Sequence, residues 1–234
     1  MILSGALWLQ SQRSPDQGGS FRVKSKFTVV KGSDASEKEI QAKVQQPGSK
    51  GSMLPTQIML QPDTEYAICS LDLSGVASDL IENVQAINSD YTGSNYHKGH
   101  LNPYADHPSG PGQLATYTLS NVATMHCPLN SRAWRNNKLR ARNIAAGCGK
   151  YVITVVVPGN NWISVNGVKR VSIPSHVWSA FCCLDYNGRP MKAKGSLPRN
   201  NTNSVHAGLT ISSLQSQLKS LLGVNVRLFQ NNCT

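Results

Sequence analysis

The amino-acid sequence predicts an α+β fold, in which strands and helices do not alternate regularly. Tyr151–Val157 (YVITVVV) is a short continuous apolar run, which is typical of a buried strand. A terminal segment with Ile211, Leu214, Leu218, Leu221 and Leu222 has the spacing of an amphipathic helix that ends at Gly223. Between such patterns the order of strand and helix signals is mixed, whereas a doubly wound sheet requires them to alternate.

The other elements are predicted from local periodicity and turn residues. Phe21–Val30 alternates between apolar and polar residues, and the rest of 10–56 reads as loop or irregular lead-in. Ile2–Leu9 is either the remnant of a signal peptide or a first strand. From residue 66 on, the patterns predict a strand over 66–73, a helix over 76–87, a polar loop over 90–95 and a strand over 114–122. A helix follows that is capped by Asn130 or Ser131 and runs to Ala146, before Gly147. The last predictions are a hairpin of 162–165 with 171–173, turned at Asn166-Gly167, and a strand over 177–184.

Size and composition favour a folded domain. The chain has 234 residues, of which 39% are hydrophobic and 15% charged, so it has enough apolar material for a core. No run approaches the roughly 20 apolar residues of a membrane-spanning helix. We predict an irregular N-terminal lead-in over 1–56 and the main domain over 57–234.

The charge is distributed unevenly along the chain. Residues 1–106 hold nine Lys/Arg against eleven Asp/Glu, a net of −2, whereas residues 107–234 hold fourteen Lys/Arg against Asp185 alone, a net of +13. Paired-carboxylate chemistry is therefore excluded from the second half. A field of this sign favours a polyanion, with nucleic acid as the first candidate. The alternative is a basic secreted protein that binds anionic surfaces weakly.

The six cysteines point to an oxidising compartment. Their number is even, and no Cys-x-x-Cys pair has a matching second pair, so a zinc ribbon is disfavoured. Cys182 and Cys183 are adjacent, so any disulfide from either must reach elsewhere in the chain. Two glycosylation triplets begin at Asn200 and Asn232. We predict a secreted or lumenal protein.

Two segments carry the chemistry. The first, Tyr96–Pro103 (YHKGHLNP), places a histidine on a glycine-containing segment, and a neutral imidazole can deprotonate water near pH 7. The second comprises TLSNV (118–122) and LNSRAW (129–134), which opens a basic helix. An amide oxygen at its start suits a hard divalent cation that keeps most of its waters.

The sequence resembles the ββα-metal (His-Me finger) fold of the DNA/RNA non-specific endonucleases, in the branch of the vertebrate endonuclease-domain-containing proteins. The matching stretches are GHLNP (99–103), TYTLSNV (116–122), LNSRAW (129–134) and IPSHVWSAFCC (173–183), over about residues 60–230. The resemblance implies a central antiparallel sheet flanked by helices and a metal-dependent endonuclease that hydrolyses DNA, with RNA as an open second substrate.

The resemblance also implies a role for each matching residue. His100 falls on the general base, Asn130 on the ligand of Mg²⁺ (with Mn²⁺ as the alternative), Asn121 on the asparagine that supports the site, and Arg142 on the helix arginine that contacts phosphate. The other predicted nucleic-acid contacts are Lys98, Arg132, Arg135, Lys138 and Arg140. Without the resemblance, Asn130 reads as a helix N-cap and the basic residues as a solvated helix face.

Three positions depart from the family pattern. His97 stands in place of the signature aspartate, Lys98 in place of its arginine, and Lys138 in place of the helix glutamate that holds a metal-bound water. These changes leave three function classes open. They are an active endonuclease, a catalytically impaired relative that still binds nucleic acid, and a secreted protein that uses the same scaffold for protein or glycan contacts.

Overall fold

The computed structural model describes residues 86–106, 116–117, 119–229 and 232–233, together with the backbone of five strands nearer the N-terminus. The chain divides into two compact units. One comprises 1–8, 20–124 and 162–172, and the other comprises 9–19, 125–161 and 173–234. The predicted helix over 76–87 lies almost entirely outside the described residues. None of the described helices is long and apolar enough to cross a membrane.

The second unit contains an antiparallel sheet in the strand order β13-β12-β11-β8-β1. The strands predicted from the two apolar runs are confirmed as its two longest strands. Nine residue pairs join them, from Gly149–Leu184 to Val157–His176. The strands are β1 (Leu7–Ser11), β8 (Gly149–Val157), β11 (His176–Leu184), β12 (Pro190–Ser196) and β13 (Ala207–Leu209).

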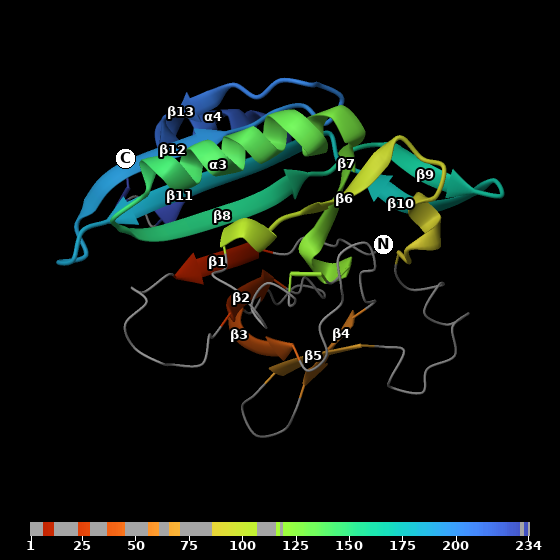
Figure 1. Cartoon of the computed structure of the whole chain (residues 1–234), viewed down its shortest axis with the longest axis horizontal. Coiled ribbons are helices and arrows are strands. Elements are labelled where there is room, and N and C mark those ends of the chain that lie inside the picture. The colour runs from red at the N-terminus through yellow and green to blue at the C-terminus, as the bar shows by residue number, and fades with distance from the viewer. Residues whose placement is uncertain are drawn as a thin grey trace. The chain divides into compact units, whose positions relative to one another are not determined.

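Two helices pack on opposite faces of this sheet. α3 (Arg135–Ile144) runs along one face (Figure 1), where Asn137 donates a hydrogen bond to the Ser196 hydroxyl at 2.8 Å. α4 (Ile211–Leu222) lies against Gly195, where a Cβ would come within 2.6 Å of the Leu214 side chain. Neighbouring residues of a strand point to opposite faces, so Gly195 and Ser196 face different helices. The predicted terminal helix is thereby confirmed, with Thr210 as its N-cap and Gly223 after its end at φ 71°.

The adjacent cysteines of β11 use the same alternation. Cys183 is bonded to Cys148, which precedes β8, and Cys182 is bonded to Cys233, which follows α4. The prediction that neither pairs with its neighbour is confirmed, because the two thiols point to different faces of the sheet. The Cys148–Cys183 bond lies beside Ala145 and Phe181, under the end of α3.

The first unit contains strands in the order β2-β3-β5-β4. The pairs β2–β3 and β4–β5 are antiparallel and β3–β5 is parallel. The predicted strands at 21–30 and 66–73 are present as β2 (Val23–Thr28) and β5 (Tyr66–Ser70), beside β4 (Thr56–Leu60). The prediction of loop for the rest of 10–56 is wrong, because β3 (Glu37–Val44) pairs with β2 on one side and β5 on the other.

A short ββα arrangement follows in the chain. β6 (Tyr96–His100) pairs with β7 (Val122–His126), and β7 leads into η5 (Leu129–Trp134), a turn of π-helix that continues as α3. Of the predicted strand over 114–122, residues 114, 115 and 118 lie outside the described residues, and the prediction is wrong for the part that is described before Val122. Leu119–Asn121 form a 3₁₀ turn, η4, and the strand begins only at Val122, because the Asn121 side chain binds backbone groups and curves the chain.

The predicted hairpin at Asn166-Gly167 is confirmed. β9 (Asn161–Val165) and β10 (Val168–Ile173) form a two-stranded sheet, and the two turn residues have φ values of 51° and 79°. Positive φ at both central residues is what a type I′ turn requires. The predicted polar loop at 90–95 is corrected at its start, because Ser89–Tyr91 form a 3₁₀ turn, η2.

Candidate functional site

β6 presents His100 on the same face as Lys98, because alternate residues of a strand share a face. The His100 imidazole is partly buried and meets the edge of the Tyr117 ring, with centroids 5.1 Å apart and planes at 86°. Tyr117 packs in turn against Tyr104 of η3 (Tyr104–Asp106), with ring centroids 5.7 Å apart. Burial, with a smaller contribution from Tyr104, raises the pKa of Tyr117, so its phenol stays neutral. The aromatic contact restricts the orientation of the imidazole.

Asn121 organises the chain that follows His100. Its side chain is buried, accepts a hydrogen bond from the Asn102 N–H at 2.9 Å, and donates to the carbonyls of Asn102 at 3.0 Å and Thr116 at 2.9 Å. Its own carbonyl accepts from the Leu101 N–H at 2.9 Å. These contacts tie residues 101–102 to the beginning of β7. Asn121, predicted from the resemblance to support the site, therefore contacts the backbone beside the histidine.

We expect Asn121→Ala to destabilise the protein by about 3 kcal/mol, because two buried carbonyls and one N–H lose their partner and each costs about 1–3 kcal/mol. Urea unfolding followed by circular dichroism measures this. Asn143→Ala, which truncates an exposed asparagine of α3, is the matched control and should stay within about 0.5 kcal/mol of wild type. Equal stability of the two variants would contradict this role for Asn121.

Lys98 is held against η2. Its ammonium donates to the Asn88 side-chain oxygen at 2.5 Å and lies 5.9 Å from the centre of the Tyr91 ring. Burial lowers the pKa of Lys98. The Tyr91 hydroxyl is 3.5 Å from the Thr124 hydroxyl of β7, so η2 contacts both strands. A phosphate contact by Lys98 stays a prediction, and these interactions compete with it.

An ion pair that the sequence analysis did not identify lies beside this cluster. Asp90 is buried and binds Arg170 of β10 through both carboxylate oxygens, at 2.9 and 3.3 Å. The same carboxylate accepts from the Ile87 N–H at 2.9 Å. The pair joins η2 to the β9–β10 hairpin. The two residues are 80 apart in the chain, and no sequence spacing connects them.

The helical segment of the second unit carries Asn130 and the basic residues. The prediction that Asn130 or Ser131 caps this helix is wrong. Helical backbone already begins at Cys127, Pro128 precedes η5, and the Ser131 hydroxyl donates back to the Cys127 carbonyl at 2.7 Å. Asn130 is partly exposed inside the π turn. Its amide is therefore not used as an N-cap.

The π turn changes which residues share a face with Asn130. In a regular α-helix, Lys138 would be rotated by about 80° from Asn130. A π turn winds less per residue, which rotates Asn130 back toward the face that carries Lys138 and, one turn later, Arg142. Single π turns are frequent at functional sites. Asn130, Lys138 and Arg142, which the resemblance groups, lie along one stripe that we call the Asn130 stripe.

The five predicted basic residues of the helical segment, Arg132, Arg135, Lys138, Arg140 and Arg142, divide between two sides of the helix. Arg135 is three residues before Lys138 and flanks the Asn130 stripe, whereas Arg132 and Arg140 point away from it. Arg132, Arg135, Arg140 and Arg142 are exposed, and Lys138 is half-buried. The Asn130 stripe thus carries two positive charges beside the amide, and Arg135 adds a third at its edge.

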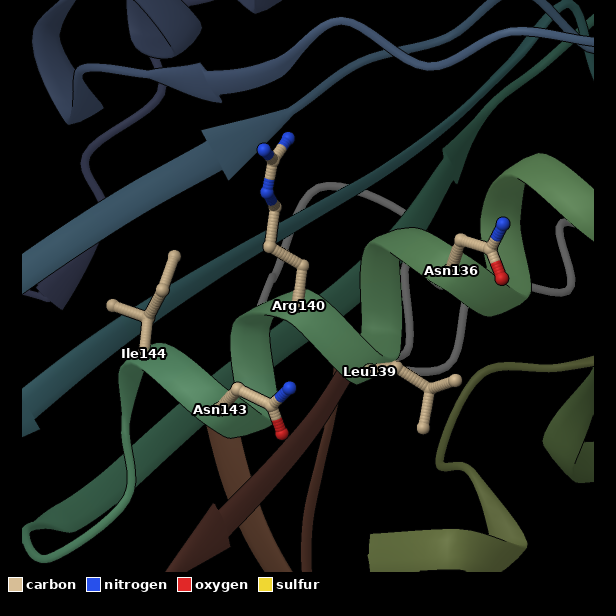
Figure 2. Close-up of a pocket in the computed structure, with 5 residues that line it drawn as sticks. All are labelled: Asn136, Leu139, Arg140, Asn143 and Ile144. Carbon is tan, nitrogen blue, oxygen red and sulfur yellow. The ribbon is translucent and has the colours of Figure 1, made fainter.

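An open hollow of about 540 Å³ is lined by residues of α3. In Figure 2, Arg140 and Ile144 point to one side of the helix, while Leu139 and Asn143 point to the other. Of the predicted site residues only Arg140 lines the hollow. It is therefore not a preformed catalytic pocket.

The donor chemistry permits only a weakly held metal. Within the described part of the chain, no group of three or more His, Cys, Asp or Glu side chains is placed to bind a metal ion. A hydrated Mg²⁺ needs only one or two protein oxygens, and the side-chain oxygen of Asn130 is a donor of that type. Lys138 in the same stripe opposes a cation. Asn130 therefore offers a donor atom of the type that Mg²⁺ prefers, while the positive charge of Lys138 lowers the affinity for the ion.

Comparison with known proteins identifies the family. Residues 77–222 match the sequence model of the DNA/RNA non-specific endonucleases. The chain belongs to this family. Endonuclease domain-containing 1 protein of Homo sapiens is 32% identical over 154 residues, which is 64% of this chain and 28% of that protein. The Mus musculus protein of the same name is 30% identical over 161 residues, covering 66% and 30%.

A solved structure supports the fold. A chain in the crystal structure of the EndoG/EndoGI complex superposes with a TM-score of 0.50 at 18% identity, covering 64% of this chain and 66% of that chain. The predicted α+β, ββα-metal fold and the resemblance to the endonuclease-domain-containing proteins are confirmed. The chain spans under a third of the length of those curated relatives. The division at 56/57 and the roles of the site residues stay predictions.

Proposed function

We propose that this non-specific endonuclease domain is a metal-dependent hydrolase of phosphodiester bonds in DNA, with RNA as a second substrate class. The observation that supports it most is the setting of His100. The imidazole is half-buried on β6 of the ββα arrangement, next to Tyr117, and Asn121 ties down the residues that follow it. A general base needs a restricted orientation, which the Tyr117 ring and the hydrogen bonds of Asn121 provide for His100.

In the proposed reaction the His100 imidazole accepts a proton from a water molecule, and the water oxygen forms a bond to phosphorus. The bond from phosphorus to the opposite ester oxygen breaks in line, and the departing alkoxide takes a proton from solvent. Arg142, exposed on the Asn130 stripe, neutralises charge on the phosphate. Arg135 contributes a second charge-assisted contact to the same backbone.

Asn130 is the proposed ligand of Mg²⁺, with Mn²⁺ as an alternative. When bound, the ion would supply positive charge to the pentacovalent phosphate and the leaving oxygen. The position of Asn130 in the π turn, where the residue is partly exposed and does not cap the helix, supports this assignment.

A specific observation favours a second candidate function, a relative that binds nucleic acid with little or no cleavage. Lys138 shares the stripe with Asn130, where the family has a glutamate that holds a metal-bound water. A positive charge there weakens the metal while it strengthens phosphate binding. Binding and cleavage must therefore be measured separately.

We also propose that the protein is secreted or lumenal. The two disulfides support this, because such bonds persist in oxidising compartments and are rare in the cytosol.

The test is nicking of supercoiled plasmid by purified protein in Mg²⁺, in Mn²⁺ and in EDTA. We expect nicking with either metal and none in EDTA. We expect Asn130→Ala to require at least about tenfold more metal for half-maximal nicking, a loss comparable to that seen when a metal site loses supporting groups. Nicking that persists in EDTA would contradict the metal-dependent reaction.

The binding candidate has its own signature. The protein is the impaired relative if it cuts DNA with neither metal but still binds random-sequence DNA. The affinity for that DNA should then fall steeply as the salt concentration rises. A flat salt response together with absent cleavage would remove nucleic acid as the partner.

A further inference from the structure

Two lysines that the sequence analysis did not assign lie next to α3. β12 and α3 are side by side in opposite directions, because Ser196 contacts Asn137 near the start of the helix and the Lys192 ammonium lies 3.4 Å from the Ile144 carbonyl at its end. Lys192 and Lys194 share the face of Ser196, since alternate residues of a strand point the same way. Lys194 is thus halfway between the two contacts, level with the middle of α3.

Arg140 is the basic residue of α3 on the side of the helix that faces these lysines. It is midway between Asn137 and Ile144 and points, together with Ile144, toward the neighbouring strands of the sheet, as Figure 2 shows. Arg140, Lys192 and Lys194 are all exposed. They form a row on the side of α3 away from the Asn130 stripe.

No carboxylate neutralises this row within the described residues of the second unit. Residues 125–161 and 173–234 hold twelve Lys/Arg and one acidic residue, Asp185. The Asp185 carboxylate accepts from the N–H groups of Asn187 and Arg189, both at 2.8 Å, inside the turn that joins β11 to β12. The row therefore keeps its positive field.

The same turn presents an aromatic ring to solvent. Tyr186 is 97% exposed, although the turn around it is held by the Asp185 carboxylate and by a hydrogen bond from the Asp185 N–H to the Arg189 carbonyl at 2.9 Å. Lys192 lies toward this end of β12. Because the backbone of the turn is already ordered, only the Tyr186 side chain loses conformational entropy when its ring stacks on a ligand.

We propose that Arg140, Lys192, Lys194 and Tyr186 form a binding surface for single-stranded nucleic acid, which we call the hairpin surface. The proposal rests on the proposed function for the identity of the polyanion. The three cations contact successive phosphates along β12, and the Tyr186 ring stacks on an unpaired base at the end of the row.

The exposed ring favours a single strand over a duplex. Paired bases are stacked on one another and leave no face for a side chain, whereas an unpaired base stacks on an aromatic ring. A row of cations that leads to an aromatic ring is the combination by which proteins bind single strands without sequence preference.

The experiment is fluorescence anisotropy with a labelled dT₂₀ oligonucleotide and a labelled 20-base-pair duplex, in EDTA so that binding is measured without hydrolysis. We expect Tyr186→Ala to weaken dT₂₀ binding about 5-fold to 150-fold, the range for loss of one stacked base. Tyr186→Phe keeps the ring and should bind as wild type does. The duplex should bind the two variants and the wild type equally.

Charge removal provides the second arm. Lys192→Gln with Lys194→Gln should lower the magnitude of the slope of log K against log salt for dT₂₀ by about 1.4, since each single-strand phosphate contact contributes about 0.7. Lys219→Gln with Arg227→Gln removes the same charge from exposed positions on and after α4, and should leave the slope nearly unchanged.

Three outcomes would overturn the proposal. They are wild-type binding of dT₂₀ by Tyr186→Ala, loss of binding in Tyr186→Phe as large as in Tyr186→Ala, and equal salt slopes for the two double variants. Absence of metal-dependent nicking with the hairpin surface intact in these assays would contradict the proposed hydrolysis and leave the surface supported.

Discussion

His100→Ala should lower the single-turnover rate of plasmid nicking by about 10²–10⁴-fold, the usual contribution of a general base. The substitution removes the only group proposed to take the proton of the attacking water, while the phosphate contacts of Arg135 and Arg142 stay in place. The affinity for DNA, measured in EDTA, should therefore change little. A loss in the rate without a loss in binding separates a catalytic role from a structural one.

His97→Ala is the matched control for this experiment. His97 has the same side chain and belongs to the same strand, but it is exposed and points to the other face of β6. The nicking rate of His97→Ala should stay near that of wild type. Added imidazole should restore part of the activity to His100→Ala, because the diffusible base fills the space left by the side chain. Nicking by His100→Ala at the wild-type rate would remove His100 from the mechanism.

The elements that the sequence predicted correctly are those whose burial pattern is local. β8 and β11 have apolar runs, and α4 has an apolar stripe with a threonine cap and a terminal glycine. The β9–β10 turn needs positive φ, which Asn-Gly provides. In each case the property that forms the element is encoded within about a dozen residues.

The elements that were missed depend on distant partners. β12 (PMKAKGS) contains two lysines, a proline and a glycine, and it is a strand because β11 and β13 pair with it on either side. Asn121 ends the 3₁₀ turn before β7 because its amide meets backbone groups up to 19 residues away. A tertiary contact decides the conformation in both cases, and a local pattern cannot show it.

The sequence motifs name candidate site residues, but they do not predict how those residues are arranged. Motif matching identified His100, Asn130 and the basic helix. The π turn, which sets the face that Asn130 shares with Lys138, has no sequence signature in LNSRAW. The division of the basic residues between the Asn130 stripe and the hairpin surface follows from that winding and from the position of β12.

Lys138→Glu should tighten Mg²⁺ binding and raise the nicking rate at limiting metal. A single charge about 6 Å from a divalent ion, at an effective dielectric near 20, corresponds to about 5 kcal/mol, and reversal of its sign doubles the difference. Lys138 is half-exposed, so solvent and salt screen most of this, and we expect about 5-fold to 30-fold in metal affinity. The metal concentration for half-maximal nicking measures it.

Arg140→Glu provides the control for Lys138→Glu, because it makes the same charge reversal on the same helix but away from the Asn130 stripe. Both variants weaken nucleic-acid binding through lost phosphate attraction, and only Lys138→Glu should lower the metal requirement. In Lys138→Glu the affinity for DNA should fall while the affinity for the metal rises. This result is distinctive, since a general loss of stability would lower both affinities. An unchanged metal requirement in Lys138→Glu would mean that Lys138 does not face the metal-binding amide of Asn130.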